Sequence, residues 1–148
     1  MSNPHPNVLT YLAAIDAFNR DDLTAVGDHV RPDFRYRIPG RSSVAGEFRG
    51  VEGFVEALAR LRDESGGTIE LTPVAVLADD ENLIARARVT AERDGKRLDT
   101  ENCYAFRFLD GKVADGQVFL SDPEHVENFW KPRTTSDRPS PASPEVRR

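Results

Sequence analysis

The sequence predicts a single α+β domain in which helices precede a curled, mostly antiparallel sheet. Three observations support this prediction. Apolar residues recur at three- and four-residue spacing before Gly66, as is typical of amphipathic helices. From Thr68 to about Ser121 they alternate with polar residues, as in strands with one buried face. The Asp-Gly pairs at 94–95 and 110–111 favour two-residue hairpin turns between those strands.

Composition narrows the functional classes. The 148 residues suit one domain, and 39% hydrophobic with 30% charged residues indicates a soluble globular protein. No apolar run approaches the roughly 20 residues that span a bilayer, and residues 1–7 lack the parts of a signal peptide. We therefore expect a flexible N-terminus at 1–7, a cytoplasmic location and no membrane partner. The net charge of −5 argues against nucleic-acid binding. Cys103 is the lone cysteine and no histidine has a ligand partner at metal-site spacing, so neither metal nor cofactor is expected.

Two helices open the expected domain, residues 8–130. Asn7 can cap the first helix. Its apolar stripe consists of Val8, Tyr11, Leu12, Ile15 and Phe18. A second, short helix carries Leu23, Val26 and Val30 and is closed by Arg31-Pro32.

A strand and a third helix follow. Phe34, Tyr36 and Ile38 alternate with Arg35 and Arg37, which predicts a strand with one apolar face. Residues 41–50 are interpreted as a loop at the border of a cavity mouth. The third helix begins at Val51 and ends at Gly66-Gly67.

Four long strands are predicted next, at 68–78, 83–93, 97–109 and 112–121. Pro73 cannot donate a ladder hydrogen bond and marks an edge or a bulge. The alternation directs one set of side chains inward: Ala85, Ala87, Val89, Ala91, Asn102, Tyr104, Phe106, Phe108, Ala114, Gly116, Val118 and Leu120. This face is apolar with a few polar atoms, so we expect it to line a cavity.

The last helix should cover the open end of the sheet. Asp122-Pro123-Glu124 has the cap, first-turn proline and acidic residue of a helix start, and Val126, Phe129 and Trp130 give the helix an apolar side. Residues 131–148 contain four prolines and five basic against two acidic residues, with little to bury. We expect this segment to be a disordered Pro-rich tail.

Several short segments resemble the SnoaL-like and ketosteroid-isomerase-like branch of the NTF2-like superfamily. They are YLAAI from Tyr11, IPGRSSVAGEFRG from Ile38, ERDGK from Glu92 and YAFRFLDGKV from Tyr104. The resemblance implies a cone-shaped NTF2-like fold, with three N-terminal helices packed on a curled sheet. Relatives of this architecture include isomerases, polyketide cyclases, epoxide hydrolases, dehydratases and binding proteins, so the reaction must be argued from the cavity.

The resemblance to ketosteroid isomerases implies a first-helix tyrosine, a late-strand carboxylic acid and a base at the end of the first strand. Tyr11 matches the tyrosine. Tyr104 stands in place of the acid, and its hydroxyl can donate the same hydrogen bond. The base position falls on Ile38, which cannot take a proton, and this argues against steroid isomerisation.

The resemblance to the epoxide hydrolases of this fold implies an Asp-Arg-Asp constellation on the long strands. The corresponding positions are Ala85, Ala87 and Val118, although Tyr36 matches a tyrosine on the first strand. Arg86 and Arg88 lie on the opposite face in this register, and a one-residue slip would exchange the two faces. We expect the water-activating site to be absent.

SnoaL-like cyclases, by the same resemblance, need an acid/base aspartate beside a conjugated ketone. Asp122 is the carboxylate in phase with the inward residues of the fourth strand, which makes it the best available base. The alternative is that Asp122 caps the last helix, as an aspartate before Pro-Glu commonly does.

Other polar residues of the expected cavity also have alternative roles. Tyr11 and Tyr36 can be core tyrosines with one satisfied hydroxyl. Asn102 is harder to explain as core, because a buried amide needs several hydrogen bonds. His29 can reach the pocket side of the second helix, but a surface or packing role is favoured.

The sequence thus predicts a homodimer, joined through the outer sheet face, whose cavity binds a small hydrophobic oxygen-bearing molecule of polyketide-, steroid- or terpenoid-like kind. Asp122 and Tyr104 are the candidate catalytic residues of a cofactor-free, enolisation-type cyclisation or isomerisation. The candidate ligand-binding residues are Tyr11, Tyr36, Ile38, Asn102, Phe106, Val118 and Trp130. Two alternatives stay open: a non-catalytic binding protein, and a protein-interaction module whose feature is the outward arginines at 35, 37, 86 and 88, which cross-strand ion pairing also explains.

Overall fold

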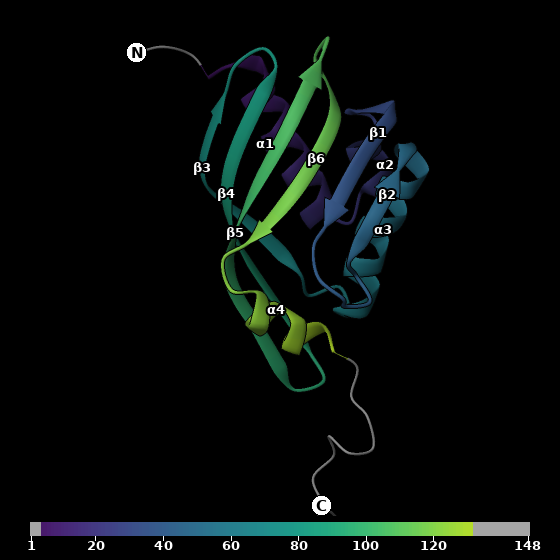
Figure 1. Ribbon diagram of the computed structural model, residues 1–148, viewed down its shortest axis with the longest axis vertical. Coiled ribbons are helices and arrows are strands. Elements are labelled where there is room, and N and C mark those ends of the chain that lie inside the picture. The colour runs from purple at the N-terminus through teal and green to yellow at the C-terminus, as the bar shows by residue number, and fades with distance from the viewer. Residues whose placement is uncertain (1–3, 132–148) are drawn as a thin grey trace, which may run out of the picture.

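The computed structural model describes residues 4–131 and confirms the α+β fold class (Figure 1). The elements are α1 (Pro6–Asn19), α2 (Leu23–Gly27), β1 (Val30–Ile38), β2 (Gly46–Arg49), α3 (Gly50–Glu64), β3 (Glu70–Ala78), β4 (Asn82–Arg93), β5 (Lys96–Leu109), β6 (Lys112–Leu120) and α4 (Pro123–Trp130). Residues 1–3 of the predicted flexible N-terminus, and the predicted tail beyond Lys131, lie outside the described residues.

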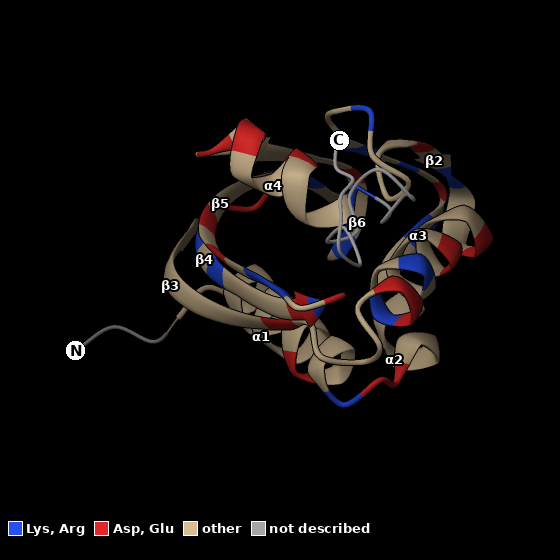
Figure 2. Ribbon diagram, turned by 90° about the horizontal axis from the view of Figure 1, so that it is seen from below, with Lys and Arg blue, Asp and Glu red and all other residues tan. Residues whose placement is uncertain are grey.

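A six-stranded sheet in the order β2-β1-β6-β5-β4-β3 forms the wall of the cone. All neighbours pair antiparallel except β1 and β6, which run parallel. The two predicted hairpin turns are confirmed: Asp94-Gly95 and Asp110-Gly111 all have positive φ, as a two-residue turn of the favoured twist requires. Seen from below, the curled strands and the helices surround a common interior (Figure 2).

Bulges lie at two of the three register shifts of the sheet and shape its curl. The register of β3 against β4 shifts between Pro73 and Ala75, so the proline sits at a bulge in an edge strand, as predicted. The second bulge lies between β5 and β6, where Arg107 pairs with Asp115 but Phe108 pairs with Val113. The extra residue is Ala114, and its insertion directs Val113 inward. The prediction that Ala114 faces the cavity is therefore wrong.

The N-terminal part differs from the sequence prediction at three points. The first helix begins at Pro6 with His5 as its N-cap, because proline fits the first helical turn; Asn7 instead donates its amide to the carbonyls of Asp79 and Asp80. Val30 starts β1 rather than ending the second helix, since it pairs with Val113. The segment interpreted as a loop contains β2, in which Phe48 pairs with Tyr36.

The helices cover the inner face of the sheet. α3 packs on β1, α1 on β3 and α4 on β5, where the last helix closes one end as predicted. Phe34 and Phe54 join β1 to α3 by an edge-to-face contact of 4.8 Å between ring centroids.

The outer face carries the charges in cross-strand pairs. Arg86 bonds Glu101 at 3.0 Å and Arg88 bonds Asp99 at 2.7 Å. On the neighbouring strands Arg35 and Arg37 both reach Asp115 at 3.4 Å. The register expected from the sequence is therefore confirmed, and ion pairing accounts for the outward arginines.

Candidate functional site

An apolar cavity of about 120 Å³ lies inside the cone. Side chains from α1, α2, β1, α3, α4 and the long strands all contribute to its lining. The lining is mostly aliphatic and aromatic, with a few polar atoms, which is the usual character of a small-molecule site.

The structure brings together eight of the nine residues predicted from the sequence. The cavity is lined by Tyr11, Tyr36, Ile38, Asn102, Tyr104, Phe106, Val118 and Trp130. They come from five elements, so only the curl of the sheet and the placement of α1 and α4 make them neighbours.

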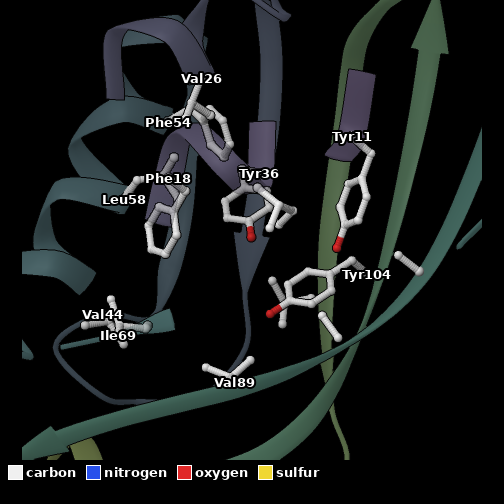
Figure 3. Close-up of a cluster of buried hydrophobic side chains, with 14 of the residues drawn as sticks. Tyr11, Phe18, Val26, Tyr36, Val44, Phe54, Leu58, Ile69, Val89 and Tyr104 are labelled. Atoms are coloured by element: carbon white, nitrogen blue, oxygen red, sulfur yellow. The ribbon is translucent and has the colours of Figure 1, made fainter. Parts of the chain in front are cut away.

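Three tyrosines form the polar centre of the cavity. Figure 3 shows the side chains of Tyr11, Tyr36 and Tyr104 with their hydroxyl groups directed toward a common space. Phe106 lies among them: its ring is 6.2 Å from Tyr36 and 6.4 Å from Tyr104, nearly parallel to both, and 6.0 Å from Tyr11. The chain has three tyrosines in all, and every one of them is in this cluster.

Burial keeps these phenols neutral. Desolvation raises the pKa of Tyr11 and Tyr36 well above the ordinary 10.0, and the proximity of Tyr104 raises both further. Desolvation also raises the pKa of Tyr104 to about 12, against a smaller lowering by the Asn102 side chain. At neutral pH the cluster therefore offers hydrogen-bond donors rather than bases.

Two polar atoms of the lining have no hydrogen-bond partner within the described part of the chain. They are the Tyr11 hydroxyl and the Asn102 Oδ1, in residues that are only 6% and 8% exposed. Buried polar atoms are nearly always paired, because an unpaired one costs the free energy of its lost hydration. Both atoms are thus available to a bound molecule.

Gly116 makes room for the aromatic cluster. It pairs with Phe106 on one side and with Tyr36 on the other. A Cβ atom here would meet Phe106 Cε1 at 2.6 Å and Tyr36 Cδ1 at 3.0 Å. Only a residue without a side chain lets both rings lie over this point of the sheet.

Asp122 does not line the cavity. It is exposed and caps α4, its Oδ1 accepting the backbone N–H of His125 at 3.1 Å. The N-cap alternative is therefore confirmed. The extrapolation from the alternation of β6 fails because the strand ends at Leu120, and the chain turns at Ser121 to start the helix.

Sequence reasoning also missed part of the lining. His29 lines the cavity, although a surface or packing role was favoured. Ser42 and Val44 line it from the β1–β2 connection, which agrees with the interpretation of this segment as the border of the mouth. Among the described lining residues, His29 is the one side chain other than the tyrosines that carries an acid–base group.

α4 and the β1–β2 connection both line the cavity and are joined by hydrogen bonds. The backbone N–H of Arg41 donates to both carboxylate oxygens of Glu127, at 3.2 and 3.1 Å. The other side of α4 is held by Lys96, whose Nζ donates to the carbonyls of Asn128 and Lys131 at 2.8 and 2.9 Å. Trp130, the last residue of the same helix, is buried.

The inward positions that carry charge in epoxide hydrolases are apolar in this structure. Ala85 and Ala87 are fully buried opposite Tyr104 and Asn102, as the sequence register predicts. Across residues 4–131, no group of three or more His, Cys, Asp or Glu side chains is placed to hold a metal ion. Within the same range, no helix is long and apolar enough to cross a membrane.

Comparison with known proteins agrees with the fold. The model of the SnoaL-like domain matches residues 11–116. An uncharacterized protein of Mycobacterium tuberculosis is 34% identical over 115 residues, which are 77% of this chain and 88% of the relative.

Two solved structures have a similar fold. Bal32a, from a soil-derived mobile gene cassette, superposes with a TM-score of 0.81 at 35% identity, over 85% of this chain and 97% of that one. A candidate SnoaL-like polyketide cyclase from Jannaschia sp. CCS1 shares the fold, with a TM-score of 0.73 at 19% identity over 90% of this chain and all of the other. The chain therefore belongs to the SnoaL-like family of the NTF2-like superfamily.

Proposed function

We propose that the protein binds a compact, largely apolar molecule with a carbonyl-type oxygen, and that the three tyrosine hydroxyls hold this oxygen. The convergence of three neutral phenols in an apolar cavity is the observation that carries the proposal. A hydrogen bond is electrostatically stronger in such surroundings than in water, so a single oxygen can orient the ligand.

The cavity volume favours small ligands within the predicted polyketide-, steroid- or terpenoid-like range. An apolar cavity of about 150 Å³ holds benzene, and the present one measures about 120 Å³. A single ring is therefore near the upper size for the cavity as it stands. A four-ring skeleton requires α4 and the β1–β2 connection to separate at the mouth.

A stability-shift screen tests the proposal. The probes are acetophenone and 1-tetralone, each paired with a hydrocarbon of similar shape, cumene and tetralin. We expect the ketones to raise the melting temperature more than the hydrocarbons. Trp130 is the single tryptophan of the chain and lines the cavity, so its fluorescence gives an independent binding curve. Equal effects of ketone and hydrocarbon, or no effect of either, would contradict the proposal.

A second candidate function is proton transfer next to the bound carbonyl, as an enolisation-type cyclisation or isomerisation requires. His29 favours it, because its imidazole lies on the cavity lining and an imidazole can act as a general base. The tyrosine hydroxyls, with Tyr104 as the predicted catalytic member, would stabilise the enolate.

Deuterium exchange separates binding from catalysis. Protein and 2-tetralone are mixed in deuterated buffer, and loss of the α-proton signals is followed by NMR. An enzyme accelerates this exchange above the buffer rate, and His29→Gln removes most of the acceleration. Asp122→Asn is the matched control, because Asp122 caps α4 outside the lining and Asn retains the cap. If the wild type does not accelerate the exchange, the proton-transfer function is wrong and the binding function is the one that remains.

A further inference from the structure

Asn102 presents an acceptor atom to the cavity that nothing in the described chain uses. It lies on the inward face of β5, and its Oδ1 is buried without a partner. The residues paired with it on the neighbouring strands are Ala87 on β4 and Leu120 on β6, and neither has a side-chain donor.

The two ends of the Asn102 amide are not equivalent in this site. A hydrogen-bonding interaction with Asn102 lowers the pKa of Tyr104. Of the two ends, the oxygen is the one that is buried without a partner, and an amide oxygen only accepts hydrogen bonds. This leaves Oδ1, which only accepts, as the end available to a ligand.

The tyrosine hydroxyls therefore need a hydrogen-bond acceptor on the ligand, whereas Asn102 Oδ1 needs a donor. A ketone oxygen satisfies the tyrosine hydroxyls but can do nothing for Oδ1. If an apolar ligand surface covers Oδ1, the atom has no hydrogen-bond partner and no water. The free energy of this unpaired atom then weakens binding. A ligand with a donor beside its acceptor removes the cost.

We propose that Asn102 is a specificity-determining residue that selects ligands carrying an O–H or N–H donor in addition to the oxygen held by the tyrosines. This inference rests on the proposed function, and it narrows the ligand class to compounds such as hydroxyaryl ketones. Asn102 and Tyr104 are two residues apart on one strand, so their Cα atoms are separated by about 6.6 Å. The two groups should therefore sit at separate positions of a ring rather than adjacent ones.

The test uses two probes of equal size, 3-hydroxyacetophenone and 3-methylacetophenone. Both keep the ketone, and the second replaces the donor hydroxyl with a methyl group. Dissociation constants are measured by calorimetry and by Trp130 fluorescence. We expect the hydroxyl compound to bind the wild type at least about tenfold more tightly, a difference of about 1.4 kcal/mol.

Two variants separate the roles of the cavity residues. Asn102→Leu removes the acceptor while keeping the side-chain size, so the ratio of the two dissociation constants should fall to about one. Tyr11→Phe is the matched control: it removes a donor to the ketone, so both probes should weaken by a similar factor while their ratio persists. If Asn102→Leu does not fold, Asn102→Ala takes its place.

The possible outcomes separate the selection of ligands by Asn102 from the proposed binding of ketones. Equal binding of both probes to the wild type would overturn the selection by Asn102 and leave ketone binding intact. A preference that survives in Asn102→Leu would also overturn it, because another residue would then provide the acceptor. If neither probe binds, the proposed function fails and the inference fails with it.

Discussion

At the residue scale, the chain concentrates its aromatic hydroxyls in one place. The inward set of β5 could be predicted from the sequence because alternation over a long strand fixes the face of each residue. For Asp122 the sequence left two roles open, helix cap and cavity base, and the structure decides for the cap because β6 ends at Leu120 before the alternation reaches this residue. The prediction that Ala114 faces the cavity fails for a similar reason, because the bulge shifts the phase of β6 and Val113 faces inward instead.

The tyrosine cluster should control the alkaline limit of stability. A tyrosine whose pKa is higher in the folded than in the unfolded protein stabilises the fold fully below pH 10. This contribution is lost as the pH rises from 10 toward the folded pKa, which is about 12 for Tyr104. Tyrosinate absorbance should therefore stay low above pH 10 and appear together with unfolding.

Near-ultraviolet absorbance and circular dichroism, recorded along one alkaline titration, check this prediction. The chain has no tyrosine outside the cluster, so no background signal interferes. A tyrosine that titrates near pH 10 while the circular dichroism stays native would contradict the burial described here.

Gly116→Ala should damage the aromatic cluster directly. The added methyl group would meet Phe106 and Tyr36 closer than carbon atoms pack, so one of the rings must move. We expect a loss of about 1–3 kcal/mol in the free energy of unfolding, measured by urea denaturation, and weaker ketone binding.

Gly53→Ala is the control for this substitution. Its added Cβ would make only ordinary contacts with Phe48, at 3.5 Å or more. It lies within α3, where alanine is favoured over glycine. The variant should be as stable as the wild type or more so. Equal behaviour of the two variants would show that Gly116 has no special packing role.

At the element scale, α4 decides how closed the cavity is. The helix itself is predictable because Asp122, Pro123 and Glu124 are a strong start signal. Its attachment by Glu127 and Lys96 is not, because side chains distant in sequence provide the contacts. β2 escaped prediction for a simpler reason: four residues are too few to show a period.

Asp122→Ala should destabilise the protein without changing ligand specificity. The N-cap hydrogen bond to His125 contributes about 1 kcal/mol to helix stability, and alanine cannot make it. Asp122→Asn retains a cap and should lie close to the wild type. Thermal melts measure both variants. A loss of ligand turnover in Asp122→Asn, with unchanged stability, would instead restore a chemical role.

Glu127→Ala should speed ligand exchange at the mouth. The carboxylate is the acceptor for the Arg41 N–H, and it lies directly against Gly40. Without it, the β1–β2 connection loses its attachment to α4. Stopped-flow fluorescence of Trp130 should show a several-fold faster dissociation of 3-hydroxyacetophenone, whereas Glu124→Ala, in the first turn of α4, serves as control. Identical rates would argue that ligands enter elsewhere.

At the scale of the whole molecule, the outer face of the sheet combines paired charges with exposed apolar side chains. Leu77, Ile84 and Phe119 are 75%, 54% and 49% exposed. Leu77 pairs with Ile84 across β3 and β4, and Phe119 pairs with Cys103 on β5. Exposed apolar side chains among ion pairs are the composition of the core and rim of a protein interface. This supports the homodimer predicted from the sequence.

Phe119→Glu should shift the protein to a monomer. In a symmetric dimer the same patch of both subunits meets, so one substitution places two carboxylates in the apolar contact. Sedimentation velocity over a range of protein concentrations measures the shift. Glu70→Gln, on the edge strand β3, is a charge-changing control that should not alter the mass. A wild type that is monomeric at all concentrations would refute the homodimer.

The parallel pairing of β1 with β6 sets the order in which the molecule can be completed. Tyr36 is synthesised early, yet Gly116, against which its ring rests, belongs to the last strand. Contacts between distant parts of a chain slow folding. During synthesis, the contact of the Tyr36 ring with Gly116 cannot form until β6 has left the ribosome. The cavity is lined by residues from α1 to α4, so it is complete only when nearly the whole described chain has been synthesised.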